Sequence, residues 1–133
     1  MQLSEFPRYF INRNSEIMRE DGTFVKQGPY YFYLRGRRLR NWSYKYVRLT
    51  QSGQRVQKRV HRLVAKTFVV NPRPDIFDIV DHIDRNKKNN NASNLRWVNT
   101  RLNSLNQDRV HNHEERFNAL YEYYLSNSDL EEC

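Results

Sequence analysis

Two adjacent residues whose side chains could take part in a reaction, Asp81 and His82, lie inside the apolar run IVDHI at residues 79–83. A strand that looks buried has little reason to carry Asp and His side by side unless they do chemistry. Among the asparagines that follow in the chain are Asn94 and Asn103. Hydrolysis of a phosphodiester bond needs a base that activates water and a cation that stabilises the extra negative charge. These four residues predict a site of that kind.

Asp81 and His82 suit two different tasks. The carboxylate of Asp81 is a hard oxygen ligand of the kind that Mg²⁺ takes, and the imidazole of His82 can accept a proton from water. Neighbouring side chains of a flat strand point to opposite faces, so we expect this pair at a strand end or bulge. A second ligand would come from the amide oxygen of Asn103 if Asn99 or Thr100 caps a helix that folds back over the hairpin.

Asn94 has two possible roles. An imidazole that presents one nitrogen to water needs a hydrogen bond at the other, so Asn94 can hold either the ring of His82 or the backbone of the loop. The neighbouring asparagines more readily make turns, because Asn tolerates left-handed backbone. Those turn residues are Asn86, Asn89, Asn90 and Asn91.

The elements that must position these residues alternate between strand and helix patterns. Apolar and charged residues alternate over 45–50 and 55–60 around a turn at 51–54, which predicts a hairpin. The stretch HRLVAKTF at 61–68 has helical spacing, and the prolines that follow stop any helix. Further strands are expected within 9–19 and over 30–34, a basic loop or strand end over 35–40, an apolar segment over 95–98 with a polar helix after it, and an amphipathic helix over 114–125.

Charge is divided unevenly along the chain. The net charge is +8, but residues 1–70 hold 15 Lys and Arg against 4 Asp and Glu, giving +11, while residues 71–133 hold 8 against 11, giving −3. This excess favours nucleic acid as the partner of the first half over the alternative of an ordinary solvated face. The residues expected to bind DNA are Arg35, Arg37, Arg38, Arg40, Lys45, Arg48, Arg55, Lys58 and Arg59.

Composition excludes several classes of protein. No run of 18 apolar residues is present, so no membrane-spanning helix is expected, and the N-terminus lacks the pattern of a signal peptide. The single cysteine, Cys133, excludes an internal disulfide and a Cys-based zinc site. We therefore expect an intracellular protein without structural zinc and without a membrane partner.

The block HRLVAKTF, then NP, VDHIDRNKKNNNASNLRWVN and LNSLN resembles the HNH homing endonucleases of phages and introns. It is most similar to the subgroup in which a β-sheet that binds DNA precedes the nuclease motif. The resemblance implies an α+β fold: an N-terminal antiparallel β-sheet, a ββα-metal finger and a C-terminal helix. The corresponding segments are 1–70, 71–110 and 111–133.

For function, the resemblance implies a DNA endonuclease that acts on double-stranded DNA in the cytoplasm of a bacterial host cell. It makes His82 the general base, Asp81 and Asn103 the ligands of one metal ion, and Asn94 the asparagine that braces the motif. An asparagine at 103 favours Mg²⁺ or Mn²⁺ over a metal that prefers histidine.

Two alternatives remain at this stage. One is a catalytically silent DNA-binding protein with the same fold, and the other is a phage accessory protein that docks through its C-terminal helix. The apolar face of the 114–125 helix can pack on its own domain or join two copies of the chain in a homodimer.

Overall fold

The computed structural model describes residues 1–107 and 113–126, so that the acidic tail with Cys133 lies outside the described residues. The fold is α+β, as predicted, with antiparallel sheets and three α-helices in the described part of the chain. The strands are β1 (Tyr9–Ile11), β2 (Ile17–Arg19), β3 (Gly28–Leu34), β4 (Arg37–Gln51), β5 (Gln54–Arg59), β6 (Ile79–His82) and β7 (Leu95–Val98). The helices are α1 (Val60–Phe68), α2 (Thr100–Gln107) and α3 (Glu114–Ser126), with a short 3₁₀ helix η1 (Ala92–Asn94). Within the described residues, none of these helices has the length and apolarity needed to cross a bilayer.

Strands β3, β4 and β5 form a sheet of two consecutive hairpins that share β4. Their two-residue turns are Arg35-Gly36 and Ser52-Gly53, and all four residues have positive φ, between 50° and 79°. Positive φ at both positions is the type I′ geometry that matches the twist of a hairpin. The turn expected within 51–54 is confirmed, and the stretch 35–40 divides into a turn and the start of β4.

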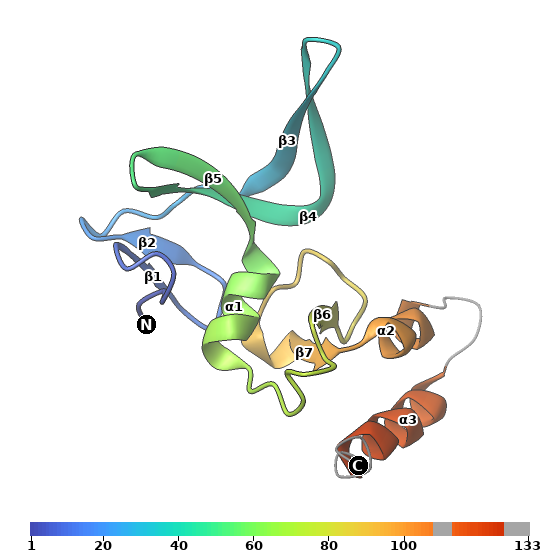
Figure 1. Ribbon diagram of the computed structural model, residues 1–133. Coiled ribbons are helices and arrows are strands. Elements are labelled where there is room, and N and C mark those ends of the chain that lie inside the picture. Colours follow the sequence, from blue (N-terminus) through green and yellow to red (C-terminus); the bar gives the residue numbers. More distant parts are fainter. Residues whose placement is uncertain (108–112, 127–133) are drawn as a thin grey trace.

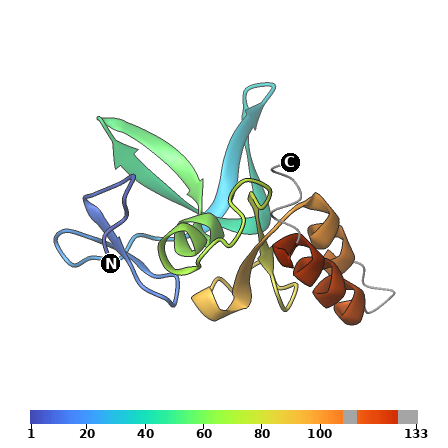
Figure 2. The same ribbon diagram turned by 60° about the horizontal axis from the view of Figure 1, so that its bottom comes forward.

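A bulge interrupts β4 halfway along its length. Gly28 pairs with Tyr46 and Tyr30 pairs with Asn41, so the four residues 42–45 of β4 lie opposite Pro29 alone. Proline has no N–H to donate to a ladder. Strand β5 pairs with β4 only from Tyr46 onward. The bend at this point separates a β3–β4 arm from a β4–β5 arm, and the two arms diverge in Figures 1 and 2.

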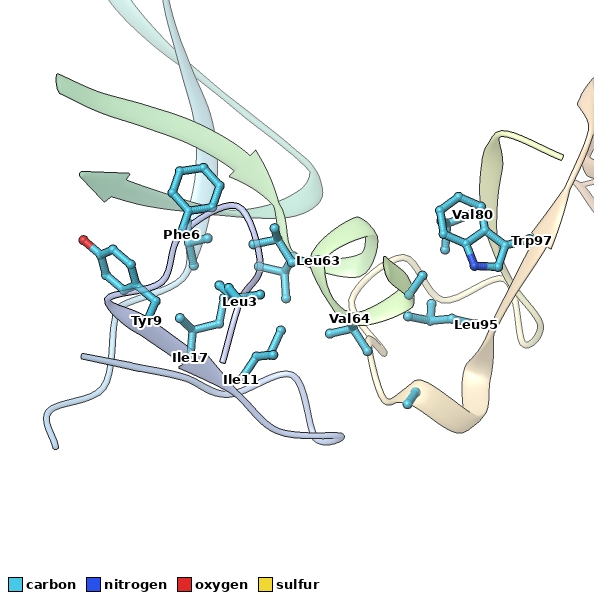
Figure 3. Packing of buried hydrophobic residues seen from close by; sticks show 14 of the residues in the cluster. Leu3, Phe6, Tyr9, Ile11, Ile17, Leu63, Val64, Val80, Leu95 and Trp97 are labelled. Atoms are coloured by element: carbon cyan, nitrogen blue, oxygen red, sulfur yellow. The ribbon is translucent and has the colours of Figure 1, made fainter. Parts of the chain in front are cut away.

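Helix α1 occupies the centre of the hydrophobic core. It lies where the sequence expects a helix, and its buried residues include Leu63 and Val64. Figure 3 shows these side chains between those of the N-terminal β1–β2 hairpin and those of the β6–β7 hairpin, such as Trp97. One continuous cluster of buried apolar side chains runs from Leu3 to Phe117. The division into the segments 1–70, 71–110 and 111–133 stays a prediction.

Helix α3 packs on its own chain through the predicted apolar face. Phe117 is 4% exposed, its ring lies 6.1 Å from that of Tyr121, and Tyr121 stacks in turn on buried Phe77 at 5.7 Å. Arg73 donates from Nη1 to the backbone oxygen of Tyr124 at 2.8 Å, near the end of the helix. Part of this face thus packs within the chain, and a homodimer through the 114–125 helix stays a prediction.

Candidate active site

A pocket of about 160 Å³ opens beside the β6–β7 hairpin. Its wall comes from β4, β6, the loop after β6, and α2, so elements from both halves of the chain meet there. The lining residues are Tyr44, Ile79, Val80, Asp81, His82, Arg85, Lys87, Asn103 and Gln107. The structure therefore brings Asp81, His82 and Asn103, which the sequence singled out, to one place.

Strand β6 ends at His82, which explains how two successive residues line one pocket. Asp81 pairs with Arg96 and His82 with Leu95 in the antiparallel ladder with β7. After His82 the chain turns away, and the N–H of Ile83 donates to the backbone oxygen of Asn94 at 2.8 Å. At a strand end the alternation of side chains is no longer enforced.

His82 is held through one ring nitrogen by an asparagine of the loop. Its Nε2 lies 2.7 Å from Oδ1 of Asn90, and Asn90 is only 2% exposed. An amide oxygen can only accept, so Nε2 donates and carries the ring proton. Nδ1 then keeps its lone pair and is the nitrogen able to accept a proton. This partner was expected to be a turn residue, and the sequence distinguished it poorly because it lies in a run of three asparagines.

Two further rings surround His82. The ring of His61 lies 5.0 Å from that of His82, and Tyr44 lies 5.0 Å from His61 and 6.3 Å from His82. Burial lowers the pKa of His61 to about 3, and the charges of His82 and nearby arginines act in the same direction. His61 is therefore neutral at physiological pH.

Asp81 is 4% exposed and held by two side chains that the sequence did not identify. Arg96 donates from Nε to Oδ2 at 3.0 Å, and Nδ2 of Asn106 lies 3.0 Å from Oδ1 and 2.9 Å from both Oδ2 and the backbone oxygen of His82. A carboxylate has about four acceptor positions, so Asp81 retains capacity for a further ligand. The guanidinium of Arg96 also lies over the ring of Phe117, with Cζ 3.6 Å from the centroid.

Asn103 reaches the pocket from α2, and the predicted cap of that helix is confirmed. Oδ1 of Asn99 accepts from the N–H of Leu102 at 3.0 Å. Asn103 lines the pocket and its Oδ1 accepts from Gln107 at 3.3 Å. Asn106 lies three residues further on the same face of the helix. That spacing in LNSLN was the available signal for the residue that contacts Asp81.

Asn94 holds the loop and not the imidazole ring. Its Nδ2 donates to Oδ1 of Asp84 and to the backbone oxygen of Asn89, both at 2.9 Å, and its Oδ1 accepts from the N–H of Asp84 at 3.1 Å. A hydrogen bond from the side chain of Asn89 is the main cause of a lowered pKa of Asp84. Of the two roles considered for Asn94, the geometry matches the bracing of the loop.

The donors of the pocket fit a hard divalent cation better than zinc. Within the part of the chain that the structure describes, no group of three or more His, Cys, Asp or Glu side chains is arranged to hold a metal ion. The pocket instead offers the carboxylate of Asp81 and the amide oxygen of Asn103. Mg²⁺ is typically bound by one or two carboxylates and keeps several waters.

Most of the basic residues expected to bind DNA lie exposed on the two arms of the sheet. Several pack on aromatic rings: Arg38 and Arg48 lie 4.1 and 5.0 Å from the centroid of Tyr31. Arg48, Arg55 and Arg59 share one face of the β4–β5 arm by the register of the ladder. Lys58 does not share this face, because it pairs with buried Val47 on the opposite one. The exposed members are Arg35, Arg37, Arg38, Arg40, Arg48, Arg55 and Arg59, and the half-buried ones are Lys45 and Lys58.

A two-stranded hairpin followed by a helix, with Asp81, His82 and Asn103 around one pocket, is the ββα finger that the sequence resemblance implied. Similarities to other proteins support this class. The chain is 33% identical over 95 residues to an uncharacterized HNH endonuclease of Acanthamoeba polyphaga mimivirus, covering 71% of the chain and 27% of that protein. It is 41% identical over 64 residues to the DNA endonuclease I-HmuI of Bacillus phage SP01, covering 48% of the chain and 36% of I-HmuI.

A solved structure of the HNH homing endonuclease I-HmuI, described as showing DNA binding and cleavage, superposes with a TM-score of 0.61 at 28% identity. The match covers 80% of this chain and 56% of that one. No family profile matches the chain. On the sequence and structural similarities together, the chain belongs to the HNH homing endonuclease family. It spans about a third or less of the length of these curated relatives.

Proposed function

We propose that the protein is a divalent-metal-dependent endonuclease that hydrolyses phosphodiester bonds of double-stranded DNA. The observation that carries the proposal is the pocket in which His82, with Nε2 bound to Asn90, lies beside the carboxylate of Asp81 and the amide of Asn103. A base with a defined tautomer next to hard oxygen donors is what this hydrolysis requires.

His82 takes the proton from the attacking water. The hydrogen bond to Asn90 places the ring proton on Nε2, so Nδ1 is the acceptor. General base catalysis by a side chain contributes about 10²- to 10⁴-fold in rate. Loss of this residue alone is therefore enough to abolish measurable cleavage.

Asp81 and Asn103 are the residues that would hold Mg²⁺ or Mn²⁺. When bound, such an ion stabilises the charge that develops on the phosphate and on the leaving oxygen. Arg96 and Asn106 orient the carboxylate of Asp81 for this task. Arg85 and Lys87 line the same pocket and attract the phosphate backbone.

The basic sheet holds the DNA while the pocket acts on one strand. The exposed arginines of the two arms contact phosphates, which supplies affinity that depends on salt. The chain has one pocket of this kind in the described residues, and one pocket accommodates one phosphate at a time. A monomer is therefore expected to nick one strand, and a double-strand cut would require a second copy.

A plasmid-nicking assay with Mg²⁺ or Mn²⁺ tests the proposal. The wild-type protein should convert supercoiled plasmid to the nicked form, and His82→Ala should not. His113→Ala, which removes a histidine outside the pocket, serves as the matched control and should cleave normally. A wild-type protein that binds DNA but cuts none under either metal would support the silent DNA-binding protein instead.

The assignment of the ligands has its own measurement. Asp81→Ala and Asn103→Ala should each lose cleavage and weaken binding of Mn²⁺, measured calorimetrically on the protein without DNA. Both variants should retain DNA binding, because neither residue belongs to the basic sheet. Intact cleavage by Asp81→Ala would show that the metal is held elsewhere.

A further inference from the structure

We propose that Tyr44 is a positioning residue that fixes the ring of the general base His82, and that it links the DNA-binding sheet to the active site. This inference rests on the proposed nuclease function. It concerns a residue from the first half of the chain, outside the motif of residues 81–103.

Tyr44 lies in the bulge of β4. Residues 42–45 lie opposite Pro29 alone in the register with β3, and pairing with β5 begins only at Tyr46. A bulge bends a strand and can aim a side chain in a direction that a regular ladder does not allow. Here the bend lies between the two arms (Figure 1), and Tyr44 of the bulge reaches the pocket that contains His82.

The rings of Tyr44, His61 and His82 form a cluster. Tyr44 lies nearly parallel to His61, with an interplanar angle of 23° and a centroid distance of 5.0 Å. His61 lies 5.0 Å from His82, and Tyr44 also approaches His82 directly at 6.3 Å. Lys87 places its Nζ 4.9 Å from the centroid of the Tyr44 ring, an attractive contact between a cation and an aromatic face.

The contacts of His82 determine how freely its ring can move. Within the part of the chain that the structure describes, the ring of His82 makes one hydrogen bond, between Nε2 and Oδ1 of Asn90, and one such bond still allows the ring to tilt. Contact with flat rings removes that freedom. His61 contributes a neutral packing surface, because its buried imidazole stays uncharged at physiological pH. Tyr44 supplies the member of the cluster that is anchored in the DNA-binding sheet.

The position of Tyr44 in β4 gives the cluster a second role. The same strand carries Arg37, Arg38 and Arg40 towards the turn of the β3–β4 arm. DNA that binds these arginines acts on the strand that holds Tyr44. Tyr44 therefore joins the strand expected to bind DNA to the ring cluster around His82.

The test compares Tyr44→Phe, which keeps the ring, with Tyr44→Leu, which removes it. At saturating DNA and Mg²⁺, Tyr44→Leu should lose about 100-fold in the single-turnover rate, the cost of a misplaced catalytic group, and Tyr44→Phe should cleave at the wild-type rate. DNA affinity should be unchanged in both. Tyr33→Leu, which removes an exposed ring of the β3–β4 arm, is the matched control and should match the wild type in rate.

A second measurement does not depend on cleavage. Nitrogen and carbon NMR of the imidazole of His82 should show a single Nε2–H tautomer in the wild type and in Tyr44→Phe, and averaged, exchange-broadened signals in Tyr44→Leu. If thermal unfolding shows that Tyr44→Leu is not folded, Tyr44→Met, whose longer and more flexible side chain fills irregular gaps, replaces it. Wild-type NMR signals in a ring-less variant that also cleaves normally would overturn the inference.

The outcomes separate this inference from the proposed function. Cleavage by the wild type together with undiminished cleavage by Tyr44→Leu refutes only the role of Tyr44. Equal losses in Tyr44→Phe and Tyr44→Leu also refute it, because the hydroxyl and not the ring would then be needed. A wild type that cuts no DNA refutes the nuclease, and the NMR comparison still decides whether Tyr44 orders His82.

Discussion

The β3–β4–β5 sheet and the β6–β7–α2 finger use polar residues in opposite ways. The sheet carries its charges on the surface, where guanidinium groups such as those of Arg38 and Arg48 rest on an aromatic ring and face solvent. The finger buries its polar side chains, and Asp81, His82 and Asn90 are each at most 5% exposed. Asp81 accepts from Arg96 and Asn106, and His82 pairs with Oδ1 of Asn90, while Nδ2 of Asn90 has no hydrogen-bond partner among the described residues.

This difference indicates how each region tolerates change. Exposed charges act on DNA mainly through their number, because each phosphate contact releases counterions whichever arginine makes it. A buried polar group without its partner carries the full cost of desolvation, so its neighbours are restricted to particular residues. The sheet should therefore respond gradually to substitution, and the finger abruptly.

The largest expected contrast is in stability. Phe117→Ala removes a buried ring that contacts both Arg96 and Tyr121, and large-to-small core changes of this kind cost about 3–5 kcal/mol. Tyr33→Ala removes a ring that is 73% exposed on the sheet and should stay within about 0.5 kcal/mol of the wild type. Urea unfolding measures both. A similar loss in the two variants would show that the sheet is not the more tolerant region.

A smaller effect concerns pH and the buried His61. Its pKa is about 3 in the folded protein against an ordinary value of 6.5, so below pH 6.5 the unfolded chain binds a proton that the folded chain does not. The stabilisation is fully present above pH 6.5 and is lost progressively as the pH falls towards 3. Between pH 7 and pH 5 this one group should remove about 2 kcal/mol.

The matched variant for that effect is His61→Phe, which has no proton to bind. Unfolding free energies of the wild type and the variant at pH 7, 6 and 5 should diverge from one pH to the next, with the variant losing less. Parallel curves would mean that His61 is protonated in the folded protein as well.

Substitution of exposed arginines of the sheet should have the smallest effect on stability. Its effect on DNA binding should grow with the number of arginines replaced. Replacing Arg37, Arg38 and Arg40 together by alanine should leave the unfolding free energy almost unchanged, because all three are exposed. The slope of log K against log salt for DNA binding should become shallower by about one for each lost phosphate contact. An unchanged slope would place the DNA on another surface.

Much of the fold could be predicted from periodicity and turn chemistry. The hairpin around 51–54, the helix that ends before Pro72 and the helix with Phe117 on its apolar face all follow from local patterns. The bulge in β4 does not follow from a local pattern, because a bulge depends on how two strands pair. Pro29 of one strand gives no sign of the four residues of the other that lie opposite it.

The candidate site divides in the same way. Asp81, His82 and Asn103 could be selected from residue type and spacing, and the structure places them around one pocket. Asn90 could not be separated from its neighbours in an asparagine-rich loop, and no pattern marks Arg96 as a partner of Asp81. For Asn106 the only signal was its spacing of three residues from Asn103. Their contacts join residues 8 to 25 positions apart and depend on the closed loop and the capped helix.

Residue types and their order establish the chemistry that the chain can offer: a carboxylate, an imidazole and amides in the order of an HNH motif, behind a strongly basic first half. The folded structure is needed to know which imidazole nitrogen can accept a proton, which side chains hold Asp81, and that Tyr44 of the sheet reaches His82. The physical reason is that residue type sets which bonds are possible. Burial and distance, which come from packing, select the ones that form.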